Sequence, residues 1–250
     1  MADFQPITYA RHGLLRRQGY SNYAFAAGDA ICALVAQEFP RAALSMPIGF
    51  IAEGEGFTPV ALMGLVPGQN LYVAADGRWL NAYIPAPYRG YPFRLGLTEQ
   101  GDQLLCVDEA SGLISDTLGT PFFNEDQSPE KGVLEMLDFF VAVESNRALT
   151  RQACAVLHTH QLIQPWIIKV QDQENEQQVE GLFRIDEAAL NALPAEALAE
   201  VRDANALALA YCQLLSMQHL QALGKLAHER NEAEKALGFG QDNGTFSFGA

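Results

Sequence analysis

In the first half of the chain, hydrophobic residues come in short runs that turn residues separate. Between positions 46 and 107 the turn signals are Pro67-Gly68, Asp76-Gly77 and Gly101-Asp102, and the runs between them read PVALMGL, NLYVA, WLNAYI, YPFRLGL and QLLCV. Asp-Gly between apolar runs is typical of a hairpin, because both residues tolerate turn geometry with positive φ. We therefore expect an antiparallel sheet of about four to six short strands over residues 46–107.

Apolar positions at helical spacing lie on the N-terminal side of this region. Residues 28–44 carry such a stripe behind Asp29, which can cap a helix; its members are Ile31, Leu34, Val35 and Phe39. Pro40 either ends that helix or separates a second turn from it. The pattern predicts a helix over residues 28–44.

Helical signals also dominate the second half. Ser128-Pro129-Glu130 supplies a capping hydroxyl, a proline for the first helical position and an acid near the positive end of the helix dipole, so a helix is predicted to begin there. A second helix is expected from Thr150 to before Pro165. A pair of strands is expected over residues 166–185, and the chain is then helical from 186 to about 237, with an interruption near Pro194.

These elements predict an α+β fold in which a sheet of short strands packs with N-terminal and C-terminal helices. The chain has 250 residues, enough to bury a sizeable core as one domain or as two small ones. We expect a single domain over residues 1–237. The tail 238–250, GFGQDNGTFSFGA, is glycine-rich and is expected to be disordered.

The net charge of the chain limits the classes of partner that it can bind. Sixteen Lys and Arg against 30 Asp and Glu give a net charge of −14. Nucleic-acid binding needs a basic face, so we expect no nucleic-acid partner. No apolar stretch approaches the length of a bilayer span, and the N-terminus lacks the apolar core of a signal peptide, so we expect no membrane insertion and a cytoplasmic protein.

No motif of cofactor or metal chemistry stands out. The four cysteines are far apart in sequence, each among apolar residues, which favours buried free thiols. His158 and His160 are the closest histidine pair, but positions i and i+2 of a helix point apart, so they cannot share a metal. No phosphate-binding loop and no nucleophile elbow is present. We expect no metal and no cofactor, and no catalytic constellation is recognisable in the sequence.

Aromatic and arginine residues form the best candidate for a ligand site. They are Trp79, Tyr83, Arg89, Tyr91 and Arg94, and His12 in the basic N-terminal segment is a further candidate. Aromatic rings beside arginine make good platforms for a flat ligand. The same group would also suit the core of a small sheet, and a surface or structural role is the alternative for His12.

The C-terminal helical region carries more apolar residues than one helix face can hold. Its stripe comprises Leu207, Tyr211, Leu214, Leu215, Met217, Leu220, Leu223 and Leu226. Burial on two sides is expected, either within the fold or against another copy of the chain through residues 205–237.

Taken together, the motifs resemble the SapC family of bacterial proteins. The matching segments run nearly end to end: HGLL at 12–15, QEFPRAA at 37–43, MPIGF at 46–50, ALMGL at 61–65, GQNLYV at 68–73, Trp79, YIPA at 83–86, RGYPF at 89–93, GTPFF at 119–123, GLFRIDE at 181–187, LNAL at 190–193 and AYCQLLS at 210–216. Met46 stands where the family pattern has an aromatic residue, and Gly90 stands where it usually has a basic one.

The resemblance implies an accessory role and no particular reaction. Family members are often encoded near TonB-dependent receptors and near halogenase-like or cupin-like proteins, which suggests nutrient uptake or modification of a small molecule or protein. We therefore expect a non-catalytic protein that binds a small-molecule ligand or a partner protein. One alternative is an enzyme with a scattered site, for instance His12, Arg89 and Asp108. Another is a structural protein associated with a surface layer, the structure for which the family is named.

Overall fold

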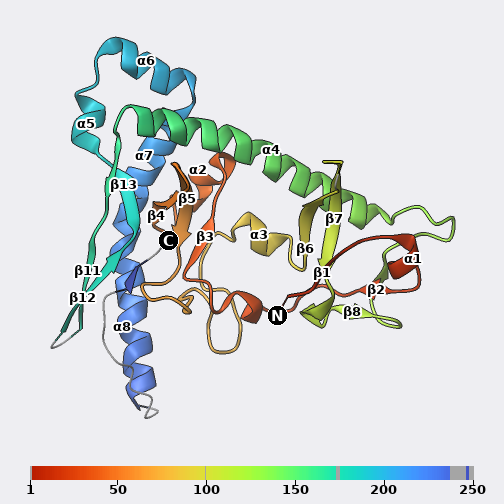
Figure 1. The fold of residues 1–250 in the computed structure, drawn as a ribbon. Coiled ribbons are helices and arrows are strands. Elements are labelled where there is room, and N and C mark those ends of the chain that lie inside the picture. The colour runs from red at the N-terminus through yellow and green to blue at the C-terminus, as the bar shows by residue number, and fades with distance from the viewer. Residues whose placement is uncertain (1, 99, 173–174, 237–245, 248–250) are drawn as a thin grey trace. The chain divides into compact units, whose positions relative to one another are not determined.

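The computed structural model describes residues 2–98, 100–172, 175–236 and 246–247 (Figure 1). The chain folds into two compact units, each built from two separate stretches. Unit 1 comprises Met1–Asn22 and Ala86–Ser145, and unit 2 comprises Tyr23–Pro85 and Asn146–Ala250. Helices and mostly antiparallel sheets occur together, which confirms the predicted α+β class.

Unit 1 contains two three-stranded antiparallel sheets, with strand orders β1-β7-β6 and β8-β2-β9. The Gly101-Asp102 turn joins β6 to β7 as predicted, and Gly101 has a φ of +89°. The elements of the unit are β1 (Phe4–Pro6), α1 (Tyr9–His12), β2 (Arg16–Arg17), α3 (Ala86–Arg89), β6 (Phe93–Leu97), β7 (Gln103–Asp108), η3 (Glu109–Ser111), β8 (Ile114–Ser115), β9 (Thr120–Pro121) and the first part of α4 (Lys131–Thr159).

The core of unit 1 lies where β6, β7 and α4 meet. Its buried members are Phe93, Leu105, Val107, Phe122, Phe123, Val133 and Phe140. Gly90, which follows α3, lies directly against the ring of Phe140, and a Cβ at position 90 would collide with that ring. The close approach therefore requires glycine at position 90 as long as position 140 is phenylalanine.

Unit 2 is organised around a five-stranded antiparallel sheet of order β10-β13-β4-β5-β3. A smaller sheet has the order β11-β12-β14. The strands are β3 (Ile31–Ala33), β4 (Ile48–Glu53), β5 (Gly56–Leu62), β10 (Ile163–Pro165), β11 (Ile168–Asp172), β12 (Asn175–Glu180), β13 (Leu182–Ile185) and β14 (Phe246–Ser247). The strands expected over residues 46–107 are thus shared between this unit and unit 1.

The C-terminal part of unit 2 is helical, with an interruption at Pro194, as predicted. Its helices are α5 (Glu187–Asn191), α6 (Ala195–Asp203), α7 (Ala206–Ser216), η4 (Met217–His219) and α8 (Leu220–Ala236); η1 (Ala24–Ala26), η2 (Ala36–Glu38) and α2 (Phe39–Ala42) come earlier.

No helix in the described part of the chain combines the length and apolarity needed to cross a bilayer. The tail expected at 238–250 lies outside the described residues, apart from Phe246 and Ser247.

The helix predicted over residues 28–44 is wrong in its first half. Residues 31–33 form β3 and pair with β5, with Ile31 opposite Leu62 and Ala33 opposite Val60. Only η2 and α2 are helical in this stretch. The apolar residues that looked like a helix stripe instead bury the edge of the large sheet, because strand pairing outweighs the local helical pattern.

Two of the expected strands, NLYVA and WLNAYI, are also absent. The Asp76-Gly77 turn lies between them as predicted, but a single bridge from Val73 to Trp79 is their only pairing. The side-chain oxygens of Asn70 and Asn81 each accept a hydrogen bond from the backbone N–H two residues later. Such local side-chain bonds compete with a strand ladder, and here they replace it.

The helix predicted to begin at Ser128 and the one predicted from Thr150 are a single helix, α4. It begins at Lys131, after Glu130, whose carboxylate accepts a hydrogen bond from the Gly132 backbone N–H at 2.8 Å. Beyond Gly132 the sequence of α4 contains neither glycine nor proline, so nothing in it favours a break. The predicted start of the helix at Ser128 and the prediction of two separate helices were therefore both wrong.

Two polar side chains of α7 join the helices of unit 2 to its large sheet. Gln213 is fully buried; its Oε1 accepts a hydrogen bond from Ile185 N at 2.9 Å, and its Nε2 donates to Ile48 O at 3.1 Å. The register of β13 and β4 would place Ile185 opposite Ile48, but their pairing stops at Phe183. The amide of Gln213 thus replaces a ladder bond where the two strands separate. Ser216 Oγ accepts a hydrogen bond from Ile48 N at 2.9 Å.

We predict that Gln213→Leu lowers the free energy of unfolding of unit 2 by about 2–4 kcal/mol, because two buried backbone groups lose their partners. Both tryptophans, Trp79 and Trp166, belong to unit 2, so tryptophan fluorescence during urea unfolding reports this unit. Gln218→Leu, at an exposed position of η4, is the matched control and should shift the midpoint little. Equal effects of the two substitutions would contradict the assigned role of Gln213.

Candidate functional site

The residues proposed from the sequence as a ligand site are divided between the units. Trp79 and Tyr83 belong to unit 2, whereas His12, Arg89, Tyr91 and Arg94 belong to unit 1. We therefore describe their surroundings one unit at a time.

In unit 2, Trp79 and Tyr83 are engaged by their own unit. The indole Nε1 of Trp79 donates a hydrogen bond to Tyr83 O at 2.9 Å, and its ring lies 5.3 Å from that of Tyr23. The Tyr83 hydroxyl donates to Oε1 of the buried Glu38 at 2.8 Å. The other oxygen of Glu38 accepts a hydrogen bond from Val35 N at 3.0 Å. These bonds hold the loop around Trp79 against the start of η2.

In unit 1, Arg89 and Arg94 are exposed and lie over aromatic rings. The guanidinium carbon of Arg89 is 5.2 Å from the ring centre of Phe139, and that of Arg94 is 3.9 Å from the ring centre of Phe4. Cation–π contacts of this kind stabilise exposed sites by about 0.5–1 kcal/mol. These contacts place each arginine against a ring of unit 1.

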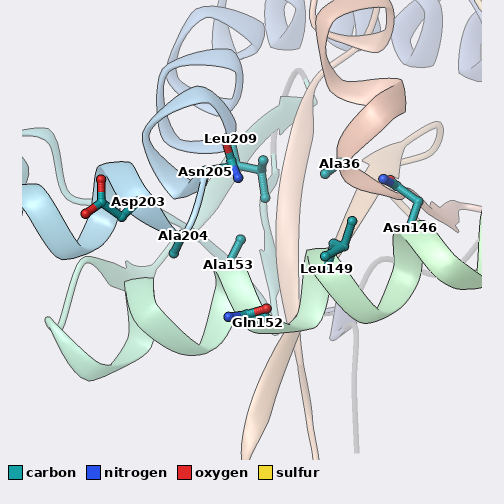
Figure 2. Close-up of a pocket in the computed structure, with 9 residues that line it drawn as sticks. All are labelled: Ala36, Asn146, Leu149, Gln152, Ala153, Asp203, Ala204, Asn205 and Leu209. Atoms are coloured by element: carbon teal, nitrogen blue, oxygen red, sulfur yellow. The ribbon is translucent and has the colours of Figure 1, made fainter.

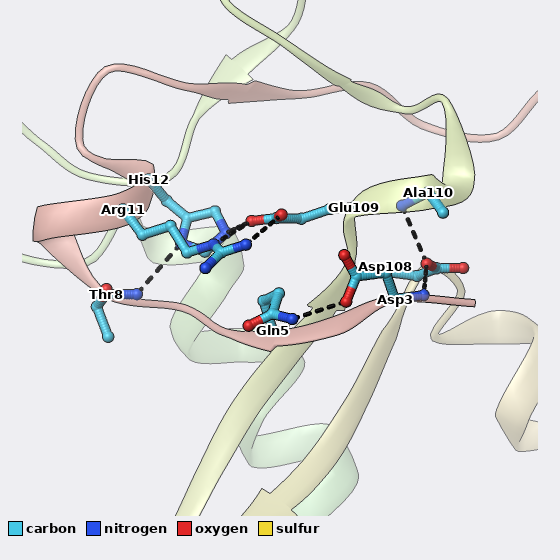
Figure 3. Close-up of polar contacts among 8 residues, drawn as sticks. All are labelled: Asp3, Gln5, Thr8, Arg11, His12, Asp108, Glu109 and Ala110. Atoms are coloured by element: carbon cyan, nitrogen blue, oxygen red, sulfur yellow. Dashed lines mark hydrogen bonds and ion pairs between the residues drawn. The ribbon is translucent and has the colours of Figure 1, made fainter. Parts of the chain in front are cut away.

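His12 is fully buried in a polar cluster at the start of unit 1 (Figure 3). Its Nδ1 accepts a hydrogen bond from Thr8 N at 3.3 Å, which leaves the proton of a neutral ring on Nε2. Nε2 lies 3.2 Å from Oε1 of Glu109, but without the alignment of a hydrogen bond. The ring also packs 5.2 Å from that of Phe122.

Glu109 is held mainly by Arg11. The Nε and one terminal nitrogen of Arg11 donate to the two carboxylate oxygens at 2.6 and 2.7 Å, a two-bond pairing that Figure 3 shows. These bonds lower the pKa of Glu109, and the carboxylate in turn raises the pKa of Arg11. Burial lowers the pKa of His12 by more than the neighbouring Glu109 charge raises it. The ring is therefore neutral at pH 7 and closed to solvent.

Asp108, the other carboxylate in this region, acts as a cap. Its Oδ1 accepts hydrogen bonds from Asp3 N at 2.7 Å and from Ala110 N at 3.1 Å, at the start of η3 (Figure 3). Burial and the charge of Asp108 raise the pKa of Tyr91, whose ring meets that of Tyr20 edge-on. This cluster thus ties the N-terminal strand to the end of β7, which is a structural role.

A small pocket of about 200 Å³ lies in unit 2 between α4, α6 and α7 (Figure 2). Asn146 lines it and uses its side-chain oxygen to accept a hydrogen bond from Gln37 N at 2.9 Å. Figure 2 shows Asp203 at one end, with its carboxylate turned away from the other labelled side chains. The volume is below the range of about 300–1,000 Å³ that is usual for ligand sites, so the pocket suits water better.

A larger pocket of about 760 Å³ also lies within unit 2. The start of β11 lines one side of it, and η4 and the first part of α8 line the other. Buried Leu65 and Ile168 form part of its wall. The described residues that line it are Leu65, Ile168, Lys169, Met217, Leu220, Gln221, Gly224, Lys225, His228 and Glu229. We call it the α8 pocket. The sequence analysis named Met217 and Leu220 only as members of the C-terminal apolar stripe and did not identify a pocket. Gly224, a glycine inside a helix, is a further signal in the sequence.

The described residues include no group of three or more His, Cys, Asp or Glu side chains placed to hold a metal ion. The cysteines are free thiols, as predicted. Burial raises the pKa of Cys154 to about 12, so this thiol stays protonated and unreactive.

Comparison with known proteins gives one match. A family model described as SapC matches residues 7–223, which is most of the chain. Neither a curated protein nor a solved structure matches the chain.

We predict that acidification destabilises the protein through His12. Because its folded-state pKa lies below the unfolded value near 6.5, the unfolded chain takes up this proton first as pH falls. The free energy of unfolding should therefore decline from about pH 6.5 downward, by at most about 1.4 kcal/mol per pH unit, until the folded-state pKa is passed.

The variant His12→Asn, whose amide oxygen can still accept from Thr8 N, should lack this component when far-UV circular dichroism follows urea unfolding at pH 7.5, 6.5 and 5.5. His228→Asn, at an exposed position, is the control and should keep the wild-type slope. Identical pH profiles for wild type and His12→Asn would show that the assignment is wrong.

Proposed function

The chain belongs to the SapC family, and from that premise we propose that it is a non-catalytic protein that binds a small-molecule ligand in the α8 pocket. We further propose that it works in the cytoplasm, as an accessory to nutrient uptake or to the modification of a small molecule or protein. Cell fractionation tests the location, and recovery in an envelope or surface-layer fraction would contradict it.

The observation that supports binding is the α8 pocket itself. Its volume of about 760 Å³ falls within the range typical of ligand sites, and its wall combines apolar side chains with a few polar ones. In contrast, Trp79 and Tyr83 use their polar groups inside unit 2. Arg89 and Arg94 stay exposed on aromatic rings and form the second candidate site.

The surroundings of the proposed catalytic residues favour binding over catalysis. The His12 ring is buried, and Asp108 accepts two backbone hydrogen bonds. A general acid or base has to reach a substrate proton directly or through one water. A fully buried ring in a structural cluster does not offer such access.

The test is to block the pocket from inside. Gly224 lines it, and a Cβ added there meets nothing within 4 Å. Gly224→Trp should fill the pocket while improving helix propensity by several tenths of a kcal/mol, so the fold should be retained. We expect mass spectrometry of protein purified from its native host to find a bound small molecule in the wild type and none in this variant.

Gly224→Ala is the matched control, since it makes the same helix-stabilising change and leaves the pocket open. Circular dichroism verifies that all variants are folded, and Gly224→Leu should give intermediate occupancy. If Trp79→Ala or Arg89→Ala removes the molecule while Gly224→Trp keeps it, the ligand site is the aromatic–arginine surface instead.

We also propose that a second copy of the chain covers the outward face of α7. Tyr211 and Leu215 on this face are 49% and 64% exposed, and Ala208 lies one turn earlier. From Ala206 to Met217 the sequence carries no charged residue. On a chain with net charge −14, this is a face where two copies can meet without bringing like charges together.

We predict that Leu215→Lys weakens self-association at least tenfold, because it buries two lysines at a symmetric contact. Analytical ultracentrifugation over a concentration series provides the measurement. Leu198→Lys, at a partly exposed position of α6, is the control and should behave as wild type. A wild-type chain that sediments as a monomer at all concentrations would refute the proposal.

A further inference from the structure

The lining of the α8 pocket changes character along the helix. Met217 and Leu220 line one end, Gly224 lies in the middle, and Lys225 and His228 line the other end. At 1.5 Å per residue, Leu220 and His228 are about 12 Å apart along the axis, on the same face of α8. The pocket therefore has an apolar end and a polar end.

The polar end is locally basic on an acidic protein. Lys225 and His228 are exposed, and within the part of the chain that the structure describes neither side chain forms a hydrogen bond or an ion pair. Lys169, which has an interaction of its own, also lines the pocket, and Glu229 is the one acid among the described lining residues. On a chain with nearly twice as many acidic as basic residues, such a cluster is favourable for an anion.

The apolar end suits an aliphatic group. The apolar side chains of the lining are leucine, isoleucine and methionine, and the described lining residues include no Phe, Tyr or Trp ring on which a flat molecule could stack. Methionine adapts its shape to flexible ligands, and buried Leu65 and Ile168 give the wall a fixed surface. A flexible hydrocarbon chain satisfies these constraints.

We infer that the α8 pocket binds an amphipathic monoanion of the fatty-carboxylate class, with its carboxylate beside Lys225 and His228 and its hydrocarbon chain toward Leu220 and Met217. The inference rests on the proposed function and names its ligand class. A ligand with one negative charge fits better than a ligand with two, because the second charge of a dianion would increase the repulsion from the carboxylate of Glu229.

The test is isothermal titration of the full-length protein at pH 7 and low ionic strength, below the critical micelle concentration of each probe. Sodium decanoate should bind with one-to-one stoichiometry. From octanoate to decanoate the dissociation constant should tighten about fourfold per methylene, as expected for full burial of the chain. Decylammonium should bind at least tenfold more weakly, although the net charge of the protein favours a cation.

Charge variants identify the end that holds the carboxylate. Lys225→Met should weaken decanoate binding about threefold to fivefold, the range expected for an exposed ion pair, and Lys225→Arg should restore it. Glu229→Gln should tighten binding by a similar factor, and Gly224→Trp should abolish it. Lys131→Met, a change of the same charge on α4 in unit 1, should leave the affinity unchanged.

Decylammonium binding as tightly as decanoate, or unchanged decanoate affinity in Lys225→Met, would overturn the inference. Decanoate binding that survives Gly224→Trp would place the ligand elsewhere and also overturn it. The proposed function fails separately, when protein from the native host carries no molecule that Gly224→Trp removes. If such a molecule is present and decanoate does not displace it, binding in the pocket stands and the fatty-carboxylate assignment falls.

Discussion

The large sheet of unit 2 depends on satisfying three backbone groups where β4 and β13 separate. Ile48 N, Ile48 O and Ile185 N lie in a dry interior, where an unpaired polar group costs about 1–3 kcal/mol. The side chains of Gln213 and Ser216 pair with all three. These bonds fix the rotation of α7 about its own axis, and so decide which residues of the helix face the core and which face outward.

The features of functional interest in unit 2 follow from that rotation. With Gln213 and Ser216 turned inward, Tyr211 and Leu215 are left on the outer face of α7. Because η4 joins α7 directly to α8, the rotation of α7 also sets the rotation of α8, in which Leu223 and Ala227 are buried. Gly224 and His228 then line the α8 pocket beside β11. Two buried polar residues thus determine both the apolar outer face and the position of the pocket wall.

The sequence predicted those parts of the fold that local chemistry dictates. The hairpin at Gly101-Asp102, the C-terminal helices and the interruption at Pro194 depend on turn and helix preferences, which act over a few residues. It failed where distant partners decide. Residues 31–33 become a strand because β5 lies beside them, and the side chains of Asn70 and Asn81 donate to the distant carbonyl oxygens of Ala26 and Ser45. The aromatic–arginine group could be listed from the sequence, but its division between two units, and the pocket around Gly224, depend on tertiary structure.

The contact between Gly90 and Phe140 has a consequence for the whole family. Any side chain at position 90 would enter the space that the Phe140 ring fills. In a close-packed core, added volume at one position has to be removed at its neighbour. Positions 90 and 140 should therefore covary in size among relatives: a large residue at 90 with a small one at 140, and the reverse in chains like this one.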